Sequence, residues 1–508
     1  MENLKLPGFE PPGKWGKAAR TGRGLRAVLR SAGLGFLLVA LGSCTVGPDY
    51  VRPKTEVPAT YKEIKGWKKA RPRDEISRGR WWKIFGDPRL DSLEEQVSIT
   101  NQNLAAAAAQ YKEALAAVSV ARSGFFPVVS AGSSAGQTLM TGGFSSSGSS
   151  VGGPQATSGG AVSDFRLSGD VAWELDLWGK VRRMVEASKA GAQASAAELE
   201  GVRLAATAQL AQDYFQLRAE DSQQRILHMT VEAYRQFLRL TKNRYGAGVA
   251  SRADVLQAET QLKTARAQEI DIGVARAQFE HAIALLMGKA PSEVSIPASP
   301  LDLRPPSVPA GLPSELLERR PDIASAERLA AEANAQIGVA IAAFYPTVTL
   351  SASGGFEAAN AAQWLAWPAR FWSLGPGQLS QTIFEGGLRR AETEQARAVY
   401  EADVAAYRQT VLSAFQQVED SLAALRILEQ EALVQGEAVE AAQKSVVVET
   451  NQYKAGMVSA LDVITTQTIA LANELSAAKI LGNRMVDDVL LIQALGGGWV
   501  AEAPRPRP

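Results

Sequence analysis

The chain has 508 residues, of which 46% are hydrophobic and 21% charged, a balance typical of a folded protein and not of a disordered one. It contains two histidines and one cysteine, and it has neither a Gly-rich phosphate-binding loop nor a Gly-x-Ser-x-Gly nucleophile motif. We therefore predict that the chain is not an enzyme and that it uses no metal and no cofactor.

Residues 1–43 are predicted to be a lipoprotein signal peptide. Seven basic side chains precede a short apolar run, Ala32–Leu41, which leads to Gly42-Ser43-Cys44. This apolar core is too short to span a bilayer and is followed by small residues, as in a signal peptide. We expect Cys44, the only cysteine, to be lipidated with palmitate; the alternative is a buried free cysteine. Residues 1–43 carry seven basic and two acidic side chains, so their removal lowers the formal charge from +1 to −4, which argues against nucleic acid as a partner.

The next segment, residues 44–90, is rich in Pro, Lys and Trp, and we expect it to be irregular and to pack along a larger body. Residues 91–122 are Ala-rich and contain no Gly or Pro, which predicts one continuous helix. Phe125-Phe126-Pro127 ends this helix, because a residue that precedes proline avoids helical geometry. No run of 18 apolar residues follows residue 44, so no conventional transmembrane helix is expected.

Two strands are predicted by the alternation of apolar and polar residues, at 164–176 and 346–353. Residues 127–136 and 376–384 alternate less regularly and are predicted to be partner strands. The connections differ in character: 137–163 is rich in Gly and Ser and is expected to be flexible, whereas 357–373 carries three tryptophans and is expected to be an interfacial loop.

Two helices of unusual length are predicted at 178–243 and 386–450. About 65 residues at 1.5 Å each give a helix of roughly 100 Å, whereas helices in globular proteins average about 11–12 residues. Such helices need partners along their whole extent. A short turn and a second helix follow each of them, at about 252–288 and 459–495, so we expect two long α-hairpins.

The hairpin tips are the best-matched part of an internal duplication. Asn243–Val255 recurs 208 residues later as Asn451–Val463, and Phe125-Phe126-Pro127 answers to Phe344-Tyr345-Pro346 at an offset of 219. The changing offset indicates one old duplication with different insertions in each half. We therefore expect a pseudo-symmetric architecture and not a stack of small repeats.

Four strands of about ten residues are long enough to cross a bilayer when tilted, with their polar face toward a water-filled lumen. The alternative is a half-buried sheet in a soluble domain. Four strands cannot close a barrel, and open edges are not tolerated in lipid. If the strands span a membrane, several copies of the chain must pool them, so the membrane interpretation predicts an oligomer.

Several motifs together resemble the NodT-type lipoprotein branch of the TolC-like outer-membrane efflux factors. The motifs are Cys44-Thr45-Val46-Gly47-Pro48-Asp49-Tyr50, Trp81-Trp82, Arg320-Pro321-Asp322-Ile323, Ile337-Gly338, Phe344-Tyr345-Pro346 and the paired Tyr-x-x-Gly tips. The resemblance covers the whole mature chain and implies an α+β fold. In it, long α-helices form a trimeric periplasmic α-barrel that continues into a 12-stranded outer-membrane β-barrel, with four strands from each chain.

The resemblance also implies a division of the chain and a function. The segments are the signal peptide 1–43, an N-terminal segment 44–90 on the periplasmic body, a first repeat 91–290, an equatorial linker 291–320, a second repeat 321–495 and a tail 496–508. The implied function is that of a passive exit duct for small molecules such as drugs. The implied partners are two further copies of the chain, a periplasmic adaptor, an inner-membrane pump of the RND class and outer-membrane lipid.

Residue roles follow from the same resemblance. A periplasmic gate is implied at Asp462 and Tyr453, with Asp254 as the counterpart in the first tip. Adaptor contact is implied at the tip residues Gly248, Ser251, Gly456 and Ser459. A second acid found three residues after the first in some relatives is replaced here by Thr465. Local chemistry is the alternative, because Asp suits the first turn of a helix, Ser suits an N-cap and Gly suits a left-handed helix end.

Two other functions remain as alternatives. One is an outer-membrane outlet for type I protein secretion, and the other is a lipid-anchored coiled-coil scaffold without a pore. The lipoprotein signal and the opening motif of the mature chain favour efflux over secretion. The scaffold would have no β-rich membrane-inserted part.

Overall fold

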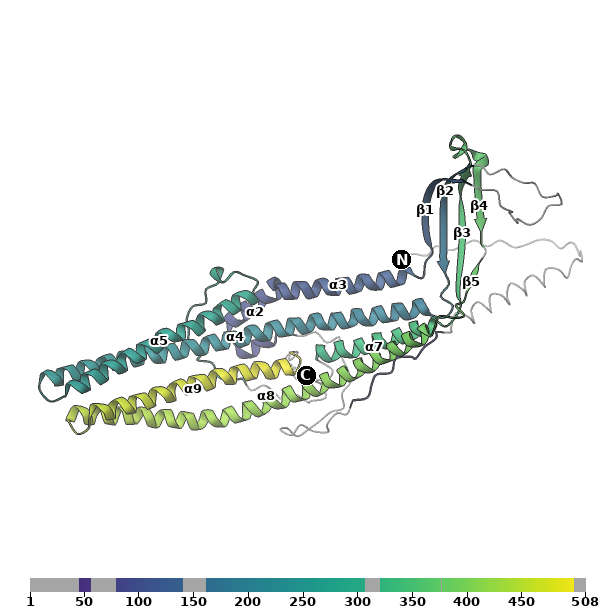
Figure 1. Cartoon of the computed structure of the whole chain (residues 1–508). Coiled ribbons are helices and arrows are strands. Elements are labelled where there is room, and N and C mark those ends of the chain that lie inside the picture. Colours follow the sequence, from purple (N-terminus) through teal and green to yellow (C-terminus); the bar gives the residue numbers. More distant parts are fainter. Residues whose placement is uncertain (1–44, 56–78, 140–160, 307–319, 376, 498–508) are drawn as a thin grey trace, which may run out of the picture. The chain divides into compact units, whose positions relative to one another are not determined.

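The computed structural model describes residues 45–55, 79–139, 161–306, 320–375 and 377–497. The expected signal peptide, residues 1–43, and Cys44 therefore lie outside the described residues. The chain divides into two compact units, one built around a sheet and the other around long helices. Figure 1 labels the elements of both units. None of the described helices combines the length and apolar character needed to cross a bilayer.

The sheet unit contains antiparallel strands from both halves of the chain. They are β1 (Val128–Leu139), β2 (Ala161–Glu174), β3 (Thr347–Ala358), β4 (Arg370–Leu374) and β5 (Gln378–Ser380), with the short 3₁₀ turns η3 (Ala361–Gln363) and η4 (Trp367–Ala369) between β3 and β4. The order is β1-β2-β3-β4, and β5 also pairs with β3. The alternation predicted for 164–176 is confirmed in β2, where charged side chains share one face of the sheet. On that face Arg166 lies opposite Glu357 of β3, with 3.7 Å between their charged atoms.

The fourth strand corrects the sequence prediction. Residues 370–374, most of which belong to the predicted loop 357–373, pair with β3, whereas only 378–380 of the predicted strand 376–384 does so. Ala352 pairs with Leu374 and Thr349 with Gln378, so β4 and β5 follow one another along the same edge of β3 with one extra residue between them. A register shift of one residue between the two pairings is that of a single strand interrupted by a β-bulge. Trp372 lies in β4, for which an aromatic residue is well suited, whereas Trp364 and Trp367 lie in the connection between β3 and β4.

The helical unit confirms the two long hairpins. Its elements are η1 (Trp81–Phe85), α2 (Pro88–Thr100), α3 (Gln102–Ser123), α4 (Lys180–Gly246), α5 (Arg252–Leu286), η2 (Pro291–Glu293), α7 (Pro321–Ala342), α8 (Leu388–Ala455) and α9 (Ala460–Ala494). α4 has 67 residues and α8 has 68, close to the expected 100 Å. In Figure 1, α4 with α5 and α8 with α9 form the two hairpins.

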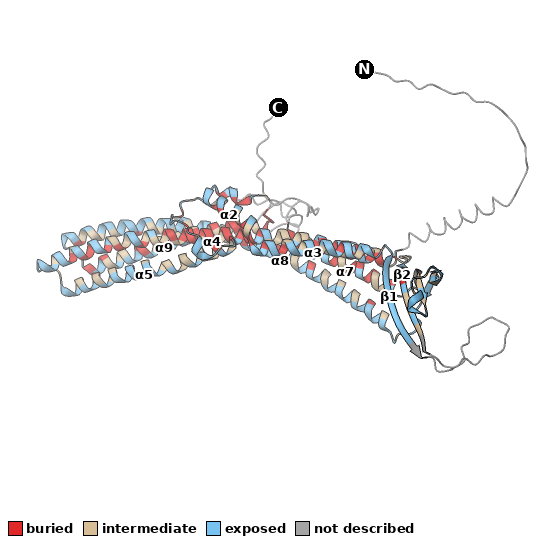
Figure 2. Cartoon of the chain, turned by 90° about the horizontal axis from the view of Figure 1, so that it is seen from above, coloured by how far each residue is buried: buried red, intermediate tan, exposed pale blue. Residues whose placement is uncertain are grey.

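The main core lies where the N-terminal segment meets the middle of α4. Phe85 packs on Phe215 with 4.8 Å between ring centroids, and Figure 2 shows the buried stretch along α4. A polar clamp lies beside it: Tyr214 donates a 2.5 Å hydrogen bond to Asp87 and accepts one of 3.0 Å from Arg218. Burial and the bond to Asp87 raise the pKa of Tyr214. Apolar packing and a satisfied polar network therefore fix this segment to the long helix.

The single helix predicted over 91–122 is wrong, because the chain breaks at Asn101. The side-chain oxygen of Asn101 accepts a 3.0 Å bond from the Leu104 amide and caps α3. Its side-chain nitrogen donates a 2.7 Å bond to the Leu286 carbonyl at the end of α5. Asn101 is buried, so both bonds are made away from water. A distant contact thus interrupts a stretch whose composition favours helix throughout.

Replacing Asn101 with alanine removes the cap of α3 and leaves the Leu286 carbonyl unpaired. We expect the free energy of unfolding to fall by about 1–3 kcal/mol. The measurement is thermal unfolding of the purified protein followed by circular dichroism. The matched control is Gln102→Ala, because the exposed Gln102 side chain bonds only the neighbouring Thr100 carbonyl. Equal losses in the two variants would contradict the capping role.

Candidate functional site at the hairpin tips

Both long hairpins turn with the same backbone geometry. At the first tip Gly248 has a φ of +76°, and the Val249 amide donates a 2.9 Å bond back to the Arg244 carbonyl. At the second tip Gly456 has a φ of +81°, and Met457 donates a 2.9 Å bond to Gln452. This pattern satisfies the last carbonyls of a helix and favours glycine at the left-handed position. The tip glycines expected from the sequence therefore serve the turn itself.

The helix that leaves each tip begins with a capping box. Ser251 caps α5 and exchanges bonds with Asp254, at 2.8 Å and 3.1 Å. Ser459 caps α9 and exchanges bonds with Asp462, at 2.9 Å and 3.4 Å. Each pair satisfies two amide donors at the start of a helix. The structure thus shows the local role of all four residues.

The second capping box has one further contact. The Ser459 hydroxyl donates a 2.7 Å hydrogen bond to the Asp462 carboxylate. This bond, together with the one from the Ser459 backbone, lowers the pKa of Asp462 below its usual value of 3.8. Asp462 is fully exposed and therefore remains an anion over a wide pH range.

The two tyrosines at equivalent positions have different surroundings. Tyr453 is only 3% exposed, whereas Tyr245 is 49% exposed. The Tyr453 ring lies 5.3 Å from the Phe237 ring, centroid to centroid, and its hydroxyl donates a 3.4 Å bond to Thr241. Both partners belong to α4, so Tyr453 joins the second hairpin to the first. The gate residue expected from the resemblance is therefore a contact between hairpins within one chain.

Arg244, which the sequence reasoning missed, completes this contact. Its guanidinium donates a 2.6 Å bond to the Tyr453 carbonyl and a 3.3 Å bond to the Lys454 carbonyl. The same group lies 4.6 Å from the centroid of the Tyr453 ring. The two bonds satisfy carbonyls at the C-terminal end of α8. This is the negative end of the helix dipole, where a cation is favoured. The sequence offers one signal for this role of Arg244, which is a difference between the two copies of the duplicated tip: the residue equivalent to Arg244 in the second copy is Gln452.

An apolar cluster underlies the joined tips. Its buried members are Phe237, Leu238, Ala258, Tyr453, Ala460 and Val463, drawn from all four helices of the two hairpins. On the outside, Val249, Leu256, Met457 and Leu461 leave large apolar side chains exposed. The tips are thus internally rigid and carry an apolar outer surface. Among the described residues, no group of three or more His, Cys, Asp or Glu side chains is placed to hold a metal ion.

Comparison with known proteins assigns the chain to a family. The model of the outer membrane efflux protein family matches residues 93–289 and 312–497. The toluene efflux pump outer membrane protein TtgC of Pseudomonas putida is 31% identical over 469 residues, which cover 90% of this chain and 93% of that protein. The pyoverdine export outer membrane protein OpmQ of Pseudomonas aeruginosa is 33% identical over 470 residues, covering 91% and 95%.

The fold gives the same result. The solved structure of the outer-membrane channel OprN matches with a TM-score of 0.79 and 31% identity, covering 90% of this chain and all of that one. Structures of this kind are trimeric TolC-like channels with the α+β arrangement of long helices and a sheet seen here. The expected fold class and outer-membrane location are thereby confirmed. The chain belongs to the outer membrane efflux protein family and is an efflux channel of the outer membrane.

Proposed function

We propose that the chain is the exit duct of a tripartite pump, a passive outlet for small molecules driven by an inner-membrane RND-type pump through a periplasmic adaptor. The observation that carries the proposal is the joining of two equivalent hairpins within one chain at Arg244 and Tyr453. Three copies would place six similar tips around one axis and make a near-sixfold tube. Relatives named for toluene efflux and pyoverdine export support small molecules as the cargo.

Pooling of strands supports the trimer. β1 and the interrupted strand β4–β5 are the two edges of the sheet in one chain. An open edge has unpaired amides and carbonyls, which lipid cannot satisfy. Three copies would pair these edges and close a 12-stranded barrel with the charged face of β2 toward water. Lipidation of Cys44 would add an anchor on the periplasmic side.

The outer surface of the tips supports contact with an adaptor. Val249 and Met457 follow the tip glycines directly and are largely exposed, and the exposed Leu256 and Leu461 lie near the starts of α5 and α9. Exposed apolar side chains beside a rigid turn are typical of a protein interface. We assign adaptor contact to these side chains, with Gly248, Ser251, Gly456 and Ser459 holding the turns that present them.

The closed gate is assigned to Asp462 and to the contact between Arg244 and Tyr453. Three Asp462 carboxylates around a narrow axis would attract cations and repel anions. Asp254 occupies the equivalent position in the first tip and would add charge at the same level. The Arg244–Tyr453 contact would hold the second hairpin inward in each chain.

Conductance tests the duct and its gate together. We expect single-channel recording in planar bilayers to show a small cation-selective conductance. Asp462→Ala removes the charged ring and should raise the conductance several-fold and weaken the cation preference. Asp271→Ala is the control, because Asp271 is an exposed acid in the middle of α5. A protein that never conducts, even as Asp462→Ala, is not a duct.

The pH dependence of selectivity tests the role of Asp462. Because its pKa is lowered, its charge is present above the usual value of 3.8 and is lost only as the pH falls through the lower pKa. In Ser459→Ala the hydroxyl bond is absent, so the pKa should rise and cation selectivity should disappear at a higher pH. Ser251→Ala removes the equivalent cap at the first tip and should leave the midpoint unchanged. A shift of the same size in both variants would assign the selectivity to another group.

The Arg244 contact is tested by hydrogen exchange at the second tip. Arg244→Met removes two bonds from a charged donor and should speed amide exchange at Gly456 and Met457 by about 10-fold or more. Arg239→Met is the control, because Arg239 is exposed on the same helix, five residues earlier. If the two variants exchange alike, Arg244 does not hold the hairpins together.

A further inference from the structure

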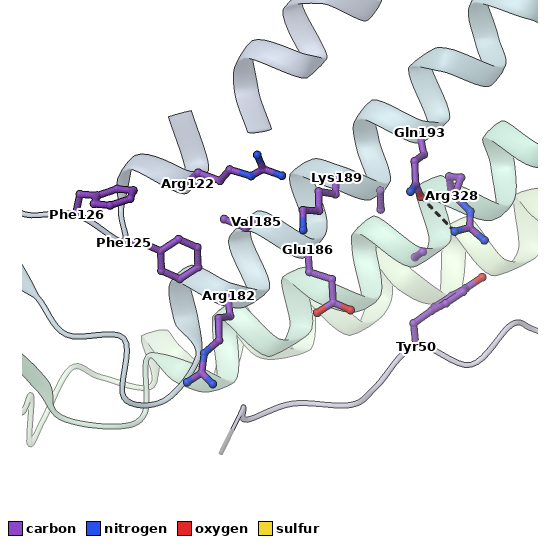
Figure 3. Close-up of a pocket in the computed structure, with 12 residues that line it drawn as sticks. Tyr50, Arg122, Phe125, Phe126, Arg182, Val185, Glu186, Lys189, Gln193 and Arg328 are labelled. Atoms are coloured by element: carbon purple, nitrogen blue, oxygen red, sulfur yellow. Dashed lines mark hydrogen bonds between the residues drawn. The ribbon is translucent and has the colours of Figure 1, made fainter. Parts of the chain in front are cut away.

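The helical unit contains a cavity of about 650 Å³ at the end of α3, separate from the tips. Figure 3 shows its walls: Arg122 and Phe125 from the end of α3, Arg182, Glu186 and Lys189 from the first turns of α4, and Tyr50 from the N-terminal segment. Arg328 of α7 adds a further cation. The volume is within the range of pockets that bind small ligands.

The charge of the cavity is strongly positive. Four cations line it, and the one lining carboxylate, that of Glu186, already accepts a 2.8 Å bond from Arg183 outside the cavity. Arg328 is paired with Glu327. Within the described residues Arg122 and Lys189 form no ion pair. These two cations are therefore available to an anion.

Apolar side chains form much of the remaining lining. Phe125 is half-buried against the cavity, and the buried Val185 forms part of its floor. Phe126 is 69% exposed although it is a large aromatic residue. Two available cations beside exposed aromatic rings match a molecule with an anionic head and an apolar body. They do not match a simple inorganic ion, which gains nothing from the rings.

Two of the lining residues are close in sequence to the strands. Phe126 precedes the first residue of β1 by two positions, and Arg182 follows the last residue of β2 by eight. A chain extends by at most about 3.6 Å per residue, so Phe126 lies within roughly 7 Å of the start of a strand. Aromatic and basic residues at such positions are typical of the boundary between lipid and water.

We propose that this cavity binds an anionic phospholipid of the periplasmic leaflet, with its phosphate on Arg122 and Lys189 and its acyl chains along Phe125 and Phe126. The site is distinct from the duct and its gate. Its loss would leave conductance intact, so failure of this proposal and failure of the proposed function are distinguishable. The occupant follows from charge complementarity and from the closeness in sequence of Phe126 and Arg182 to the strands.

Native mass spectrometry of the full-length trimer tests the site. The protein is mixed with equal amounts of phosphatidylglycerol and phosphatidylethanolamine that carry the same acyl chains. We expect a preference for phosphatidylglycerol that falls by roughly 25-fold in the double variant Arg122→Gln, Lys189→Gln, because each of the two cations contributes about a fivefold factor near an anionic lipid. The control is Arg239→Gln, Lys263→Gln, which removes the same two charges from exposed positions on α4 and α5.

Three results would overturn the proposal. The first is that the natural protein shows no preference for phosphatidylglycerol, as expected if a neighbouring copy fills the cavity. The second is that the control variant loses the preference to the same extent. The third is that soluble glycerol phosphate binds as tightly as the lipid. Should the double variant fail to assemble, the single change Lys189→Glu at an exposed position provides the same comparison. It should abolish the preference through repulsion of the headgroup.

Discussion

The structure depends on one constraint: a helix of about 100 Å is stable only if other helices pack along its whole length. α4 meets this requirement largely within the chain, because buried residues occur along it from Val181 to Thr241. α8 does not, since its buried residues are few and concentrated in its middle. Leu412, Leu433, Val434 and Val447 are left exposed along it. In a single copy, much of the surface of α8 therefore has no packing partner. In the proposed trimer, a neighbouring copy would pack against it.

Duplication provides the symmetry of the tips, and divergence between the copies determines how they are joined. Both turns have the same left-handed glycine and the same capping box, so the backbone of the two tips is equivalent. The side chains are not equivalent. Arg244 answers to Gln452, and the buried Tyr453 answers to the exposed Tyr245. Within a chain the two hairpins thus have a strong contact, and the contact between chains must be chemically different.

Much of the fold was predictable because its signals are local. Long proline-free stretches predicted α4 and α8, and alternation predicted β2. The errors occurred where distant contacts decide the outcome. The break at Asn101 depends on the Leu286 carbonyl, and β4 is a strand because β3 pairs with it. In the candidate site, turn and cap residues were recognisable from their types. Arg244 was not, because its acceptors lie 209 and 210 residues away.

The Arg244 contact has a consequence for how freely the second tip can vary. Its acceptors are backbone carbonyls, which every amino acid possesses, so the bonds place no demand on the side chain of Lys454. Random substitution can alter the charge and size of that exposed position while the hairpins remain joined. The two bonds depend on the side chain of Arg244, which belongs to the other half of the chain. The exposed surface of the second tip can therefore change to suit a different partner while the two hairpins of the chain stay joined.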